Sequence, residues 1–146
     1  MKKLVSAAAV VAAIFSIPAH ASDEKMMFPI AGGMSDSEAQ AKLDPSVKFY
    51  FGNQPTPKVI SRLGADKTSQ KTNAFAKSSD KVCNHAFLSA LLSLQKRAHE
   101  LGANAVVNVV SNYNNVEYSS QTDFECHVGG IMGGVALKGE FVKVAN

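Results

Sequence analysis

The sequence is poor in residues that carry much recognition chemistry. Among its 146 residues there is no tryptophan, there are three tyrosines and two cysteines, and 18% of the residues are charged. The shortage of tryptophan and tyrosine argues against a stacking platform for sugars or nucleic-acid bases. A hydrophobic fraction of 46% excludes disorder by composition. A chain of this length and composition is expected to form one globular domain.

A strong excess of one charge is also lacking. The chain has 15 basic and 12 acidic residues, which gives a formal net charge of +3. Lys2 and Lys3 lie in an N-terminal segment that is expected to be removed, and without them 13 basic residues face 12 acidic ones. A surface for nucleic acid or another polyanion is therefore not predicted.

The one long hydrophobic run lies at the N-terminus and has the features of a secretion signal. Two lysines precede an apolar stretch over residues 4–17, and Ala19 and Ala21 supply small residues at −3 and −1. We expect residues 1–21 to be a signal peptide cleaved after Ala21, which makes the mature protein periplasmic. The run is shorter than the roughly 20 residues of a membrane span, and no cysteine adjoins the cleavage point. Neither a stable membrane anchor nor a lipid anchor is expected.

The start of the mature chain differs in composition from the rest. Residues 22–46 are small and polar and are expected to be poorly structured apart from one short helix. Ser35 and Glu38 have the spacing of a capping box, which places that helix over residues 36–42. The remaining residues, 47–146, are expected to form a single domain.

Two strands are expected early in this domain. Residues 47–51 alternate between apolar and polar side chains, which is typical of a half-buried strand. Residues 58–63 predict a second, weaker strand that ends at Gly64. Residues 65–80 are polar and contain several lysines, and this pattern leaves open both a continued strand and a loop.

The clearest element is a helix over residues 81–101. Ser79 or Asp80 offers an N-cap oxygen, and Gly102 supplies a left-handed stop. Leu88 and Leu92 make the apolar face wide, which indicates either close cover by a sheet or contact with another subunit. The apolar stripe at helical spacing consists of Cys83, Phe87, Ala90, Leu91, Leu94, Ala98 and Leu101.

Three further strands are expected after the helix, over residues 105–113, 121–128 and 134–144. Gly139 marks a bulge or a point of close approach in the last of them. Short connections favour an antiparallel meander, because parallel strands need long crossovers. The sequence thus predicts an α+β fold of two layers, in which one main helix covers an antiparallel sheet of about four to five strands.

Both cysteines are expected on inward faces of their elements. Cys83 belongs to the helix stripe, and Cys126 alternates in phase with Phe124 and Val128. A helix packed on a sheet brings these faces together, so in an oxidising compartment the pair should form a structural disulfide. Closing a loop of about 43 residues stabilises a fold by about 4 kcal/mol in the chain-entropy model.

Two other interpretations of the cysteines are weighed against the disulfide. Cys83, Cys126 and His127 make a candidate set of transition-metal ligands. The alternation of a strand argues against this ligand set. Neighbouring residues point to opposite faces, so Cys126 and His127 are poorly placed to coordinate the same ion. Alternatively, Cys83 lies in the first turn of the helix, where the dipole favours a reactive thiolate, but no partner base or redox motif accompanies it.

No sequence motif assembles a catalytic or cofactor site. The glycines of residues 129–134 lack the Lys-Ser/Thr of a phosphate-binding loop and precede a strand, so a hairpin turn is expected there. Asp123 and Glu125 share the polar face of a strand, where carboxylates normally serve solvation. His85 and His99 are expected to face solvent from the helix. We therefore expect no catalytic residues and no cofactor.

The segment Ala-His-Glu-Leu-Gly-Ala-Asn-Ala-Val-Val, residues 98–107, ends a helix and enters a valine-rich strand. With the strands that follow, it resembles the YbjQ-like and RcsF-like fold group over residues 81–144. Members are often described as heavy-metal-binding, form ring oligomers, or sense envelope stress as lipoproteins whose disulfides tie the helix to the strands. Similar small exported proteins are often named "excinuclease ATPase subunit", although this chain has no nucleotide-binding motif.

These observations favour a non-enzymatic periplasmic interaction or binding module with one structural disulfide and a role in envelope homeostasis. Its expected partner is an unknown envelope protein or a second copy of the chain. A periplasmic transition-metal-binding protein is the alternative that the resemblance implies.

Overall fold

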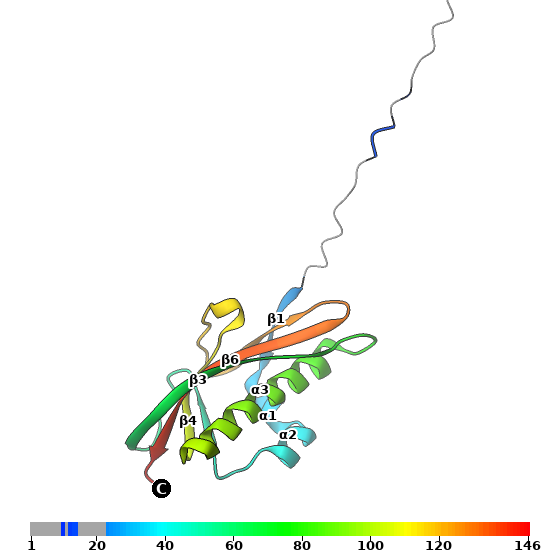
Figure 1. Cartoon of the computed structure of the whole chain (residues 1–146). Helices are drawn as coiled ribbons and strands as arrows, with labels where there is room; N and C mark the ends of the chain where they lie inside the picture. The colour runs from blue at the N-terminus through cyan, green and yellow to red at the C-terminus, as the bar shows by residue number, and fades with distance from the viewer. Residues whose placement is uncertain (1–9, 11, 15–22) are drawn as a thin grey trace, which may run out of the picture.

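The computed structural model describes residue 10, residues 12–14 and residues 23–146 of the chain (Figure 1). The predicted signal peptide, residues 1–21, lies outside the described residues except at those four positions. Within the described ranges, no helix combines the length and the hydrophobicity needed to cross a bilayer.

The described residues form an α+β fold, as the sequence predicts, with helices on one face of a curled sheet. The α-helices and strands, in chain order, are β1 (Glu24–Pro29), α1 (Ile30–Ser35), α2 (Ser37–Lys42), β2 (Lys48–Phe51), β3 (Val59–Asn73), α3 (Ser79–Leu101), β4 (Ala105–Ser111), β5 (Asp123–Val128) and β6 (Met132–Val144), and a 3₁₀ turn, η1 (Tyr113–Asn115), follows β4.

Strand β6 is the centre of the sheet. β3 pairs with it antiparallel along one edge, while β5 pairs with the start and β4 with the later part of the other edge. β1 extends the sheet beyond β5, and β2 extends it beyond β4. The three strands after the helix pair antiparallel, as predicted, although β6 lies between β4 and β5. The expectation of a wholly antiparallel sheet is wrong, because β2 and β4 are parallel. β3 and α3 lie between them in the chain and supply the long crossover that a parallel pair needs.

Helix α3 lies along the sheet face formed by β3 and β6, with α1 beside it (Figure 1). Gly102 ends the helix in the left-handed conformation at φ 72°, as predicted. Leu88 is 3% exposed. Packing within the same chain therefore buries this part of the wide apolar face, without contact with another subunit. The predicted stripe from Cys83 to Ala98 is buried against the sheet.

The strand β1 departs from the prediction for residues 22–46. Glu24–Pro29 pairs antiparallel with β5, more than ninety positions away in the chain. Its sequence, Glu-Lys-Met-Met-Phe-Pro, does not alternate between polar and apolar residues, so periodicity gives no sign of a strand. The pairing with β5 organises a segment that was expected to be poorly structured.

The short helix predicted over residues 36–42 is confirmed as α2, whereas α1 was not predicted. α2 begins after Asp36, whose carboxylate accepts a hydrogen bond from the Glu38 amide at 3.0 Å, so Asp36 is the N-cap and not Ser35. α1 contains two glycines, which are poor helix formers. Gly33 is required by packing, because a Cβ there would lie 2.6 Å from Cδ1 of Phe87.

Strand β3 continues through most of the region that the sequence left open. It extends to Asn73, well past Gly64, where a register shift replaces the predicted end. β3 lies at an edge, paired only with β6, and most of its side chains are exposed or half-buried. Such a strand needs no hydrophobic alternation, which is why its polar sequence was ambiguous.

Candidate functional site

The predicted disulfide between Cys83 and Cys126 is confirmed. Cys83 comes from the first turns of α3 and Cys126 from β5, their Cα atoms are 5.9 Å apart, and both residues are fully buried. The bond therefore joins the helix layer to the sheet inside the hydrophobic core. Neither sulfur is available as a thiolate in this oxidised form.

His127, the third residue of the metal-ligand hypothesis, lies on the other face of β5. Its ring stacks on Tyr113 with centroids 3.5 Å apart and planes 7° apart. The structure therefore does not bring Cys83, Cys126 and His127 together as ligands. Nowhere in the described ranges do three or more His, Cys, Asp or Glu side chains gather in a way that could hold a metal ion.

A group of polar side chains centred on the buried Glu125, here called the Glu125 cluster, lies on the outer face of the sheet. It consists of Lys25, Ser111, Tyr113, Glu125 and His127. Lys25 Nζ lies 3.1 Å from Glu125 Oε1, and His127 Nε2 lies 3.5 Å from Glu125 Oε2. The Glu125 amide donates to Ser111 Oγ at 3.0 Å. The Nε2 atom of His127 is buried and makes no hydrogen bond within the described residues.

The burial of Glu125 corrects the expectation of a solvated carboxylate. Glu125 is only 6% exposed, because β1 pairs beside it and the η1 segment brings Tyr113 over this face of the sheet. Burial raises the pKa of the Tyr113 hydroxyl, and the Asp23 carboxylate 3.4 Å away raises it further. The outer face thus contains an ion pair that alternation on β5 alone did not reveal.

Replacing Lys25 with methionine is expected to destabilise the protein by about 1–3 kcal/mol, because it leaves the Glu125 carboxylate buried without its cation. The double variant Lys25→Met/Glu125→Gln is expected to recover most of this loss. Urea unfolding of both variants measures the effect. Lys42→Met is the matched control, because its partner Glu38 is exposed and the loss should be far smaller. Equal losses for Lys25→Met and Lys42→Met would contradict the role given to burial.

His85 and His99 face solvent, as predicted, and each meets a carboxylate from the α2 region. His85 Nδ1 lies 3.2 Å from Glu38 Oε2, and His99 Nε2 lies 3.1 Å from Asp44 Oδ2. A hydrogen bond from Lys42 lowers the pKa of Glu38, and His85 lowers it further. Both pairs connect α3 to the segment around α2.

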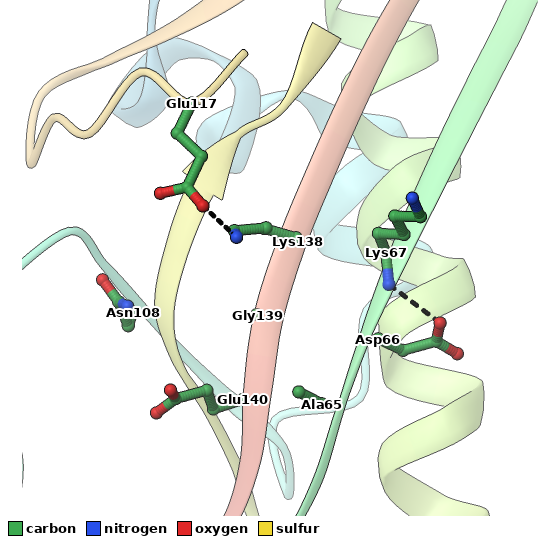
Figure 2. A pocket seen from close by; sticks show the side chains of 8 residues that line it. All are labelled: Ala65, Asp66, Lys67, Asn108, Glu117, Lys138, Gly139 and Glu140. Atoms are coloured by element: carbon green, nitrogen blue, oxygen red, sulfur yellow. Dashed lines mark hydrogen bonds and ion pairs between the residues drawn. The ribbon is translucent and has the colours of Figure 1, made fainter. Parts of the chain in front are cut away.

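An open groove of about 410 Å³, here called the charged groove, lies on the outer face of the sheet (Figure 2). Glu117 forms an ion pair with Lys138, and Arg62 Nη1 lies 3.2 Å from Glu140 Oε2. The two groove glutamates are thus engaged by cations of the chain itself. The groove is lined by Ala65, Asp66, Lys67, Asn108, Glu117, Lys138, Gly139 and Glu140.

A β-bulge shapes this groove. Two residues of β4, Asn108 and Val109, face the single Gly139 of β6, and Asn108 has a positive φ of 49°. A Cβ at Gly139 would lie 2.7 Å from Cγ1 of Val106. The predicted close approach at Gly139 is confirmed, while the extra residue belongs to β4. The bulge places Asn108 at the groove (Figure 2).

Three large apolar side chains at one end of the molecule, here called the apolar tip, were not singled out from the sequence. Phe75 and Ile131 are each 71% exposed and Met132 is 44% exposed. The turn at 129–131 is the predicted hairpin connection, with the Gly129 amide donating to the Met132 carbonyl at 2.8 Å. The sequence feature that could have indicated this patch is the presence of large apolar residues in segments that otherwise have the composition of turns.

The chain matches no protein-family model and no curated protein. Its candidate functional features are therefore those that its own geometry defines. They are the buried Cys83–Cys126 disulfide, the Glu125 cluster, the charged groove and the apolar tip.

Proposed function

We propose that this protein is an exported, disulfide-stapled interaction module that works in the bacterial periplasm by binding, without catalysis. The observation that carries the proposal is the disulfide between Cys83 and Cys126, two fully buried residues that join α3 to β5. Structural disulfides form and persist in oxidising compartments and are rare in the cytosol. The signal-peptide pattern of residues 1–21 supports the same location independently.

Binding, and not catalysis, is supported by how the polar groups are used. Glu117 and Glu140 of the charged groove are paired with Lys138 and Arg62, and the buried Glu125 is paired with Lys25. Each of these carboxylates is already engaged by a cation of the same chain. The resemblance of residues 81–144 to the YbjQ-like and RcsF-like group supports a role in envelope homeostasis, with an envelope component or a second copy as the partner.

Cell fractionation tests the proposed location. We expect the chain, expressed in bacteria from its own start, to be released with the periplasmic contents, at a mass that corresponds to residues 22–146. The matched control replaces Ala19 and Ala21 with lysine, which removes the small residues that signal cleavage requires. That variant should keep its full length and stay with the membrane fraction. Full-length wild-type protein in the cytoplasmic fraction would contradict the proposal.

A further inference from the structure

We propose that the apolar tip, formed by Phe75, Ile131 and Met132, docks reversibly on the surface of a lipid bilayer. The inference rests on the proposed function, because export places the protein between the envelope membranes. It names the membrane itself as one binding partner. The contact differs from an anchor, since it uses side chains of the folded domain and not a spanning segment.

The shape of the tip favours a bilayer over a protein groove. Phe75 follows the end of β3, and Ile131 lies in the β5–β6 turn. The two turns are held side by side by a hydrogen bond from the Ala74 amide to the Ile131 carbonyl at 2.7 Å, and they lie at the same end of the sheet (Figure 1). A bilayer requires no complementary shape and accepts such side chains at its headgroup and acyl boundary.

The described chain enters the domain at the same end that carries the tip. Glu24, the first residue of β1, pairs with Val128, and Asp23 lies against Gly129 next to the tip. The chain that precedes β1 therefore joins the domain beside the tip. That part of the sequence contains the apolar run of residues 4–17.

The charges at this end indicate that insertion, and not electrostatic attraction, would drive the contact. Lys71 pairs with Gly134 on β6, Lys77 donates its amide to Ala74, and Val82 of the first α3 turn packs on Gly133. The charged residues that these contacts place beside the tip are two basic ones, Lys71 and Lys77, and two acidic ones, Asp23 and Glu24. Neither sign dominates, so binding should tolerate salt.

The absence of tryptophan from the sequence provides a direct reporter. Phe75→Trp places a single tryptophan at the tip, and Ile60→Trp places one at a site that is 63% exposed near the far end of β3. Both variants are purified with the disulfide formed and mixed with vesicles of phosphatidylethanolamine and phosphatidylglycerol, and with vesicles of phosphatidylcholine alone. We expect the emission of Phe75→Trp to shift to shorter wavelength with both vesicles, at low and at 0.5 M salt, and Ile60→Trp to be unchanged.

Vesicle co-sedimentation measures the same contact without a reporter. Because the tip side chains are exposed, Phe75→Ser/Ile131→Ser should fold like the wild type while its partitioning onto vesicles falls about tenfold. Equal shifts for the two tryptophans, or binding lost at 0.5 M salt, would overturn the proposal. So would a blue shift without lipid that grows with protein concentration, because the tip would then join two copies. The absence of vesicle binding would contradict the membrane contact without contradicting the proposed periplasmic location. Cell fractionation tests that location separately.

Discussion

Replacing both Cys83 and Cys126 with alanine is expected to lower the free energy of unfolding by about 4 kcal/mol. The bond closes a loop between residues 43 positions apart, and the chain-entropy model gives that value for a loop of this length. Total stabilities of single domains are about 5–15 kcal/mol, so the loss is a large share. Urea unfolding followed by circular dichroism measures it directly.

Reductant supplies the control for this prediction. Wild-type protein that is unfolded and refolded in excess dithiothreitol should unfold at the urea concentration of the double alanine variant, while the variant itself should not respond to reductant. Both cysteines are fully buried. The rate at which dithiothreitol reduces the native protein should therefore be limited by the rate at which the protein unfolds around the disulfide. A wild-type curve that does not move after complete reduction would show that the bond adds little.

The second large effect is expected for Phe87→Ala, at about 3–5 kcal/mol. Phe87 is fully buried on α3 and stacks on Phe124 of β5, with ring centroids 4.1 Å apart and planes 8° apart. The ring centroid of Phe51 of β2 lies 6.0 Å away, and Gly33 of α1 packs against the same Phe87 ring. Removing the ring opens a cavity lined by residues of four elements, α1, β2, α3 and β5.

Phe75→Ala is the matched control for this cavity, because it removes the same atoms from a ring that is 71% exposed. Its thermal unfolding should be close to that of the wild type, while Phe87→Ala should melt far lower. Similar melting temperatures for the two variants would contradict the central place given to Phe87.

The sequence predicts best those elements whose signal is local. Helix α3 was predicted because its apolar stripe repeats at helical spacing and Gly102 ends it, and β5 because Phe124, Cys126 and Val128 alternate with polar residues. These two elements carry the cysteines. The disulfide could therefore be predicted by combining the helical spacing of α3 with the strand alternation of β5. Their inward faces also fixed the relation between helix and sheet.

Elements whose signal is not local were missed or misjudged. β1 owes its order to pairing with β5, and the parallel pair of β2 and β4 depends on the crossover through β3 and α3. β3 is polar because it lies at an edge. Glu125 was placed on a solvated face because alternation on one strand cannot show that Lys25 and Tyr113 arrive from elsewhere to cover it.

The most direct test of the central claim, that the exported protein works with its two sulfurs bonded to each other, is an intact mass after alkylation. Protein taken from the periplasm is denatured in the presence of iodoacetamide, once without reductant and once after reduction. We predict no added label in the first sample and two labels in the second. Two labels without reductant would contradict the account and would return Cys83 and Cys126 to the candidate ligands of a metal ion.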